Sequence, residues 1–316
     1  MKSRLLWHES KDKSILREIV VTPRDELVMV KSMYSFISQG TERLVSGGMV
    51  PVDLHTNMRV PYMQGDLSLP CSYGYSLVGE VVSENHSHFR KLVHIMHPHQ
   101  EVCLVGEGDL NMIPGNISPK VATLHSNMET AVTGVWNSAV ENGQKILISG
   151  FGSIGALTAI ALKQMTHTNI FISDKDEDRL NIAQEMGFEI WRGESVHRAF
   201  HSTSTESGLQ ACIDTLEDFG RIIELSWYGD RKISLDLGGS FHYGNKQIIS
   251  SQVSQIPPHM KGWDFNKRSE LMWQLLEDDA CSTLVENEIG FSESPGYFNK
   301  LRSGMAMPQS TVIRYN

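Results

Sequence analysis

The sequence predicts an α/β protein in which a β-rich domain is interrupted by an inserted, doubly wound parallel sheet of the Rossmann type. Residues 1–126 contain short apolar runs such as ELVMVKSMY, separated by Gly, Pro and Asn, with little helical periodicity. Residues 127–254 alternate fully apolar runs such as KILISG with helix-like segments, as in a parallel sheet covered on both faces. Residues 255–316 end in a short strand, STVIRY, so we expect this segment to return to the first domain.

The composition indicates a globular protein without a nucleic-acid or membrane partner. The chain has 316 residues, 40% of them hydrophobic, which is enough for two folded domains. Its 28 basic and 37 acidic side chains give a formal net charge of −9, which offers no general attraction to phosphate backbones or anionic membranes. We find no apolar run of membrane-spanning length and no signal peptide. Four scattered cysteines, without a C-x-x-C pair, indicate reduced thiols in a cytoplasmic protein.

The strongest motif is a glycine-rich turn between a buried strand and a helix. In KILISGFGSIGALTAIALKQ, Gly150, Gly152 and Gly155 have the spacing G-x-G-x-x-G. Such glycines allow a tight turn, close approach of the backbone to a pyrophosphate, and close packing of the helix on the strand. The N–H groups of the first helical turn, which includes Ser153 and Ile154, favour phosphate. A turn that only bends the chain is the alternative, but the surrounding strands and helix favour a dinucleotide site.

An acidic residue at the end of the next strand indicates which dinucleotide binds. The strand NIFIS ends at Asp174, where a carboxylate would hold the adenosine ribose hydroxyls. Its charge would repel the 2′-phosphate of NADP, which favours NAD. Lys175 and Arg179 are nearby cations that would accommodate this phosphate, so NADP remains an alternative.

With these residues in place, the whole chain resembles the medium-chain dehydrogenase/reductase superfamily of alcohol dehydrogenases and quinone reductases. It is most similar to a zinc-free branch that includes hydroxyethyl-bacteriochlorophyllide dehydrogenase. The resemblance implies a GroES-like β domain, an inserted Rossmann domain and a tail that returns to the β domain. Besides the glycine turn, the matching stretches are FISQGTERLVSGG (36–48), YGYSLVGEVV (73–82), HPHQ (97–100) and NMETAVTGVW (127–136).

The departures from the family concern zinc. Ser38 stands where zinc alcohol dehydrogenases have a catalytic cysteine, Gly74-Tyr75-Ser76 replaces their Gly-His-Glu motif, and the four-cysteine structural zinc loop is missing. Serine and tyrosine do not supply the ligands that zinc prefers, so we expect no metal. His94, His97 and His99 are the rival metal ligands. On an extended strand only His97 and His99 would share a face, and we expect His94 near the surface.

Without zinc, hydrogen-bond donors must stabilise the oxyanion that develops during hydride transfer. The candidates are Ser38, Thr41, Tyr75 and His97. The resemblance places Thr41 near the family's proton-relay hydroxyl, Tyr75 beside the nicotinamide and His97 in the substrate pocket. A titrating histidine beside a hydroxyl would form a proton relay near neutral pH. Each candidate also has a plain structural interpretation, such as packing or a hydrogen-bonded turn.

The resemblance implies four further cofactor contacts. Thr130 would lie near the nicotinamide, Ser226 and Trp227 would follow a strand at the ligand-binding edge of the sheet, and Arg314 would pair with the pyrophosphate.

The expected function is zinc-independent, NAD(P)-dependent hydride transfer between the nicotinamide and a secondary alcohol or ketone. The alternatives are NADPH-dependent reduction of an activated C=C bond, of the quinone or enoyl reductase type, and non-catalytic dinucleotide binding. We expect a homodimer that acts on a small molecule.

Overall fold

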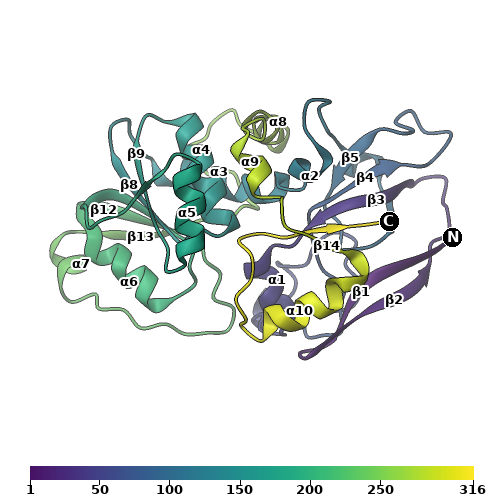
Figure 1. The fold of residues 1–316 in the computed structure, drawn as a ribbon, viewed down its shortest axis with the longest axis horizontal. Helices are drawn as coiled ribbons and strands as arrows, with labels where there is room; N and C mark the ends of the chain where they lie inside the picture. The colour runs from purple at the N-terminus through teal and green to yellow at the C-terminus, as the bar shows by residue number, and fades with distance from the viewer. The chain divides into compact units, whose positions relative to one another are not determined.

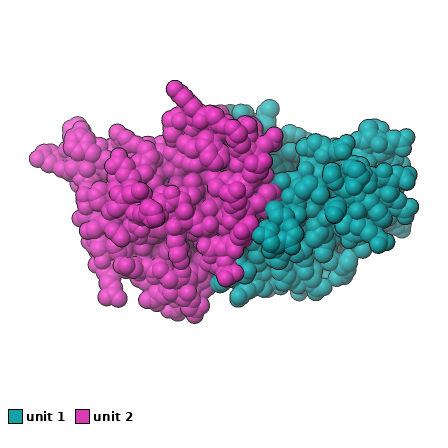
Figure 2. Space-filling view, turned by 90° about the horizontal axis from the view of Figure 1, so that it is seen from above, with its two compact units in different colours: residues 1–126, 281–316 teal, residues 127–280 magenta.

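The computed structural model describes residues 1–316, which divide into two compact units (Figure 2). Unit 1 comprises Met1–Ser126 and Cys281–Asn316, and unit 2 comprises Asn127–Ala280. The chain therefore leaves unit 1, forms unit 2 and returns, as an inserted domain requires. The predicted return segment, 255–316, is divided between the units, because residues up to Ala280 belong to unit 2. Its helix α8 (Phe265–Leu275) contacts another helix of unit 2, so the second boundary lies at 280 and not at 254.

Unit 1 is built on a seven-stranded sheet and a separate two-stranded sheet (Figure 1). The larger sheet has the order β14-β15-β3-β4-β5-β7, with β6 also paired to β3. The smaller sheet pairs β1 with β2 in antiparallel register. The strands are β1 (Lys2–Ser10), β2 (Lys13–Val20), β3 (Val28–Phe36), β4 (Leu77–Val81), β5 (Leu92–Ile95), β6 (Val102–Val105), β7 (Asn111–Met112), β14 (Glu288–Gly290) and β15 (Val312–Arg314). Alternating valine, leucine and isoleucine side chains bury one face of the larger sheet, including Val30, Leu77 and Val93.

The C-terminal strand completes the larger sheet of unit 1. Strand β15 pairs antiparallel with β3, with Val312 opposite Phe36. Helix α10 (Ser294–Arg302) packs on β2 and on α1 (Gln39–Ser46). The residues that follow Ala280 therefore belong to the same unit as the β-rich N-terminal part of the chain. The remaining short helices of this unit are η1 (Val52–Leu54), η2 (Glu107–Asp109), α2 (Pro119–Ala122), α9 (Ala280–Thr283) and η3 (Phe291–Glu293).

Unit 2 contains a six-stranded sheet in which every neighbouring pair is parallel. The strand order is β10-β9-β8-β11-β12-β13. This is the order of dinucleotide-binding folds, with two halves of three strands that diverge from the switch point between β8 and β11. The strands are β8 (Lys145–Ser149), β9 (Asn169–Ser173), β10 (Glu189–Ile190), β11 (Val196–His201), β12 (Leu216–Glu224) and β13 (Gln247–Ser250). The predicted Rossmann sheet is confirmed.

Helices lie between most strands of unit 2, because parallel strands need a crossover between them. The connecting helices are α4 (Ser153–Met165), α5 (Glu177–Glu185), α6 (Glu206–Thr215) and α7 (Ser240–Tyr243), while α3 (His125–Ser138) precedes β8 and α8 follows β13. Ile146, Leu147 and Ile148 are consecutive and all buried, so both faces of the central strand are covered. No helix in either unit has both the length and the apolar composition that a bilayer span requires.

Candidate functional site

Three hydroxyl side chains of unit 1 meet at the start of helix α1. Ser38 precedes this helix, Thr41 lies in its first turn, and Tyr75 lies just before strand β4. The Tyr75 side chain forms hydrogen bonds with both Ser38 and Thr41. We call these three residues the hydroxyl cluster. The structure thus brings together three of the four side chains that were predicted from the sequence to handle the proton.

The Tyr75 phenol remains protonated over the whole neutral range. Burial raises the pKa of Tyr75 to about 12, and the negative charge of Glu42 acts in the same direction. The hydrogen bonds from Ser38 and Thr41 oppose this shift only in part. A protonated phenol is a hydrogen-bond donor, which is the form needed to stabilise an oxyanion.

A buried carboxylate and imidazole lie next to the hydroxyl cluster. Glu42 Oε1 accepts the backbone N–H of Ser38 at 2.7 Å, and Glu42 Oε2 lies 2.8 Å from His99 Nε2. Both side chains have an exposed fraction of 0%. The other ring nitrogen of His99 bonds to Ser35 Oγ at 2.7 Å, and Ser35 Oγ bonds to Tyr315 OH at 2.9 Å. Every polar atom of the pair therefore has a partner, as burial requires.

Gly74 allows the loop that carries Tyr75 to lie against His99. Its φ angle is +124°, a conformation that residues with a side chain rarely adopt. A Cβ atom at this position would also lie 3.0 Å from two atoms of the His99 ring. Glycine is thus needed both for the backbone conformation and for the contact. In the sequence, Gly74 was visible only as part of a motif that departs from zinc dehydrogenases.

His97, the fourth predicted catalytic residue, has partners outside the hydroxyl cluster. Its Nδ1 atom lies 2.8 Å from the carbonyl oxygen of Pro98 and 3.4 Å from Cys103 Sγ, and its ring stacks on Tyr62. Burial lowers the pKa of His97 to about 4, so it carries no charge at neutral pH. The structure therefore places His97 apart from the hydroxyl cluster, and its role in a proton relay stays a prediction. The histidine next to the cluster is His99, which we had considered only as a rival metal ligand.

The expectation that His94 lies near the surface was wrong, because this residue is only 3% exposed. Strand β5 ends at Ile95, so the alternation that we extended to His97 and His99 does not continue. His94 Nε2 lies 3.0 Å from Ser76 Oγ, and burial lowers the pKa of this histidine. The structure contains no group of three or more His, Cys, Asp or Glu side chains arranged to hold a metal ion.

The glycine turn of unit 2 has the geometry of a phosphate-binding loop. Gly150 has φ +95°, and a Cβ atom on Gly155 would lie only 1.9 Å from the Gly150 carbonyl oxygen. A Cβ atom on Gly152 would have only Arg179 Nη1 within 4 Å, at 3.7 Å, so the space beside this backbone is open. Helix α4 begins at Ser153 and lacks a side-chain cap. Its free N–H groups and the open space at Gly152 fit a pyrophosphate.

Asp174 lies beside this turn, directly after strand β9. Its Oδ2 atom accepts the backbone N–H of Phe151 at 2.7 Å, and its Oδ1 atom accepts that of Asp176 at 3.0 Å. Arg179 lies 3.7 Å from the carboxylates of both Asp174 and Asp176. Lys175 is exposed. The positive charge of Arg179 is therefore already shared between two carboxylates.

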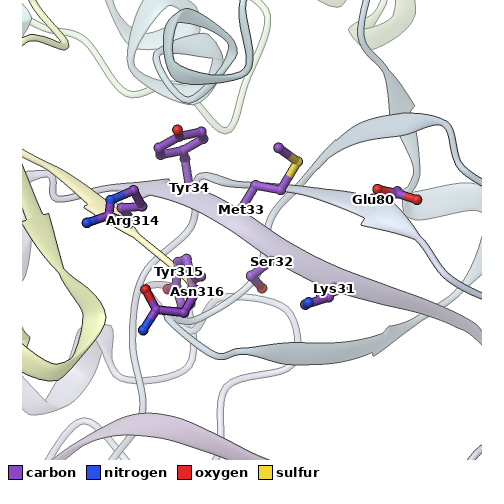
Figure 3. Close-up of a pocket in the computed structure, with 8 residues that line it drawn as sticks. All are labelled: Lys31, Ser32, Met33, Tyr34, Glu80, Arg314, Tyr315 and Asn316. Atoms are coloured by element: carbon purple, nitrogen blue, oxygen red, sulfur yellow. The ribbon is translucent and has the colours of Figure 1, made fainter.

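The other predicted cofactor residues lie in both units. Thr130 lies on α3, and Ser226 and Trp227 follow β12 in unit 2. Arg314 lies on β15 of unit 1, where its Nε atom is 2.6 Å from Glu288 Oε1. Figure 3 shows Arg314 near Tyr34 at the edge of a cavity of about 290 Å³. The structure thus gives Arg314 a carboxylate partner, and its contact with a pyrophosphate stays a prediction.

Solved structures share this architecture over the full chain. The structure of 2R,3R-butanediol dehydrogenase from Bacillus subtilis has a TM-score of 0.76 and 18% identity, and covers 100% of both chains. L-idonate 5-dehydrogenase from Escherichia coli has a TM-score of 0.78 and 12% identity, and the match covers 99% of this chain and 98% of the other. The chain has the medium-chain dehydrogenase fold.

Sequence similarity to curated members of the medium-chain dehydrogenase group is partial. The chain is 24% identical over 206 residues to D-guloside 3-dehydrogenase from Escherichia coli K12, and the match covers 59% of each protein. It is 36% identical over 75 residues to L-threonine 3-dehydrogenase from Shigella dysenteriae, which is 24% of this chain and 22% of the relative. The chain therefore spans less than two thirds of the length of the curated relatives that it matches. No protein-family model matches the chain.

Proposed function

We propose that this chain is an NAD-dependent oxidoreductase that interconverts a secondary alcohol and a ketone without a catalytic zinc ion. The dinucleotide-binding topology, the open glycine turn and Asp174 support the cofactor. The similarity to butanediol, guloside and threonine dehydrogenases supports the dehydrogenase reaction. One observation carries the proposal furthest. This observation is the hydrogen bonding of the Tyr75 hydroxyl to Ser38 and Thr41. These three hydroxyls are poor zinc ligands, but together they can donate and pass on a proton.

When bound, the nicotinamide supplies or accepts the hydride. The protein's own part is to hold the substrate oxygen and to manage its proton. Because its pKa is about 12, Tyr75 is protonated and donates a hydrogen bond to the carbonyl oxygen of the substrate. This hydrogen bond becomes stronger as negative charge develops on that oxygen. The proton that the product alcohol needs leaves the Tyr75 hydroxyl. The hydroxyls of Ser38 and Thr41 relay a proton from solvent to Tyr75 along their hydrogen bonds, each taking up one proton as it gives one up.

The donor chemistry of the hydroxyl cluster supports the absence of zinc from this mechanism. Ser38 and Tyr75, which stand at positions of family zinc ligands, bond to each other. Ser76, which stands at a third such position, bonds to His94 Nε2 and to the Thr123 carbonyl oxygen. A neutral hydroxyl and a phenol with a raised pKa are poor ligands for zinc, which takes thiolate, imidazole or carboxylate groups.

The surroundings of Asp174 support NAD over NADP. A 2′-phosphate would meet the Asp174 carboxylate, and Arg179 has its charge balanced by Asp174 and Asp176. Binding the phosphate would require Arg179 to leave these partners, which costs electrostatic energy inside a partly buried site.

A screen of secondary alcohols with NAD⁺ tests the proposal. The panel should include diols, polyols and glycosides, with NADH absorbance as the readout and a chelator present. We expect turnover of at least one secondary alcohol by the wild type and its loss in Tyr75→Phe, with NADH affinity preserved. Tyr73→Phe is the matched control, because its hydroxyl bonds only to the Met58 carbonyl at 3.4 Å. Equal activity in Tyr75→Phe and wild type would refute the role of the hydroxyl cluster.

A further inference from the structure

A buried histidine–glutamate pair lies at the carboxyl edge of the unit 2 sheet. His201 is the last residue of β11, Glu224 is the last residue of β12, and the two are partners in the parallel register. His201 Nδ1 lies 2.9 Å from both carboxylate oxygens of Glu224. The exposed fractions are 0% for the His201 side chain and 12% for that of Glu224. Neither residue was predicted from the sequence to belong to the site.

This pair connects the loops that follow the two strands. On one side, His201 Nε2 bonds to Thr203 Oγ1 at 2.6 Å. On the other side, Glu224 Oε1 accepts the backbone N–H of Ser226 at 2.8 Å. The two loops are also joined directly, because Ser226 Oγ accepts the backbone N–H of Ser204 at 3.0 Å. Ser226 is thus held through both its backbone and its side chain.

Tyr228 adds a second connection between the same loops. Its hydroxyl donates to Glu224 Oε2 at 3.1 Å, and burial, followed by the Glu224 charge, raises the pKa of Tyr228, so this donor stays protonated. The Arg231 guanidinium lies over the Tyr228 ring and donates to the Ser204 carbonyl oxygen at 3.2 Å. The Glu224 carboxylate therefore fixes the side chain as well as the backbone of the loop after β12.

The loop after β11 also packs against the phosphate-binding turn. Ser202 Oγ donates to the Gly150 carbonyl oxygen at 3.0 Å. A Cβ atom on Gly150 would lie 2.9 Å from Thr203 Cγ2. The loop after β11 thus contacts the glycine turn through Ser202, and the bonds of His201 and Glu224 connect the same loop to Ser226 and Tyr228.

The position of Glu224 in the sheet mirrors that of Asp174. The first half of the sheet is β8-β9-β10, and Asp174 follows its middle strand, β9. The second half is β11-β12-β13, and Glu224 ends its middle strand, β12. In folds of this kind each half serves one nucleotide of the dinucleotide. Because Asp174 belongs to the adenosine half, Glu224 belongs to the half that serves the nicotinamide mononucleotide.

We infer that His201 and Glu224 are positioning residues for the nicotinamide mononucleotide half of the cofactor, which they serve by holding Ser226 and Tyr228 in place. This inference rests on the proposed function. A purely structural role would affect the binding of both halves of the dinucleotide equally. The inference instead predicts that breaking the pair weakens binding of the nicotinamide mononucleotide half and not of the adenosine half.

Calorimetric titration with NADH and with AMP tests this inference, because AMP has only the adenosine nucleotide. In Glu224→Gln and in His201→Gln, we expect the Kd for NADH to rise about tenfold while the Kd for AMP is unchanged. Tyr228→Phe removes the hydroxyl that donates to Glu224 Oε2 at 3.1 Å and lies 3.5 Å from His201 Nδ1, and it should raise the Kd for NADH about threefold. This variant provides a test if the buried variants do not fold. Asp174→Ser should weaken binding of both ligands.

Val196→Ala is the matched control, because Val196 is fully buried on the same strand as His201 but at its opposite end. It should lower the melting temperature and leave both Kd values unchanged. An unchanged Kd for NADH in folded Glu224→Gln, or an equal loss for NADH and AMP, would overturn the inference. Failure of the wild type to bind NADH would instead refute the proposed function.

Discussion

The Glu42 carboxylate lies 2.8 Å from the imidazole of His99, and neither side chain has any exposed surface. Glu42 also accepts the backbone N–H of Ser38, so the pair is bonded directly to the hydroxyl cluster. Burying such a pair costs desolvation energy, and removing one partner leaves the other buried without its hydrogen-bond partner. The pair therefore has consequences for both stability and chemistry.

Removing one partner of this pair should destabilise unit 1 strongly. Glu42→Ala leaves His99 Nε2 and the Ser38 N–H without an acceptor, and loss of one member of a buried pair typically costs about 3 to 5 kcal/mol. Chemical denaturation of the full chain measures this cost. Glu9→Ala is the control, because the Glu9–Lys13 pair is largely exposed, and it should change the stability by less than about 1 kcal/mol. Similar costs for the two variants would mean that Glu42 is not part of a buried network.

Thr41→Val should lower turnover while leaving NADH affinity unchanged. The substitution keeps the shape of the side chain and removes the hydroxyl that bonds to Tyr75. Loss of one donor in a relay typically lowers the rate constant by about 10²- to 10³-fold. Steady-state kinetics with a substrate found in the alcohol screen gives kcat and KM separately. A change confined to KM would indicate that Thr41 binds substrate but moves no proton.

The cofactor preference should depend on Asp174. The wild type should bind NADH more tightly than NADPH, and Asp174→Ser should reduce the difference, because the 2′-phosphate then meets no carboxylate at that position. Fluorescence titration with both cofactors measures the two Kd values. If the wild type prefers NADPH, then Lys175 and Arg179 bind the phosphate and the proposed specificity is wrong.

Acid should destabilise unit 1 through its buried histidines. Burial lowers the pKa of His97 from the usual histidine value of 6.5 to about 4, and that of His8 to about 3. A lowered folded-state pKa means that the unfolded chain binds more protons between these values, so stability is fully present above pH 6.5 and falls as the pH drops toward 4. Melting curves across this range should show the decline, and His97→Gln should reduce its slope. A melting temperature that is constant from pH 7 to 4 would contradict the burial of these histidines as neutral groups.

The fold was predictable because its signals are local and repeated. The apolar strands around Leu147 and the glycine spacing from Gly150 to Gly155 each depend on neighbouring residues, and the topology confirms the Rossmann sheet. The boundary at 280 was missed because residues 255–280 have no strand pattern. Their attachment to unit 2 depends on long-range contacts, such as the hydrogen bond from Gln164 to the Leu275 carbonyl oxygen.

The candidate site was only partly predictable, because histidines close in sequence face different neighbours. His97 and His99 are two residues apart, yet one bonds to Pro98 and Cys103 and the other to Ser35 and Glu42. The two histidines differ because β5 ends at Ile95, before either of them. The residues HPHQ contain no pattern that predicts where the strand ends. His201 and Glu224 are 23 positions apart and meet only because β11 and β12 pair in parallel register.

The rate of NADH formation by zinc-depleted protein tests zinc-independent hydride transfer most directly. The full chain is treated with chelator, its zinc content is checked by elemental analysis, and turnover of a secondary alcohol is followed with NAD⁺. Because Tyr75, Ser38 and Thr41 handle the proton in the proposed mechanism, the rate should equal that of untreated protein and should not rise when zinc is added. A rate that falls in proportion to the zinc removed, and returns when zinc is restored, would contradict the proposed mechanism.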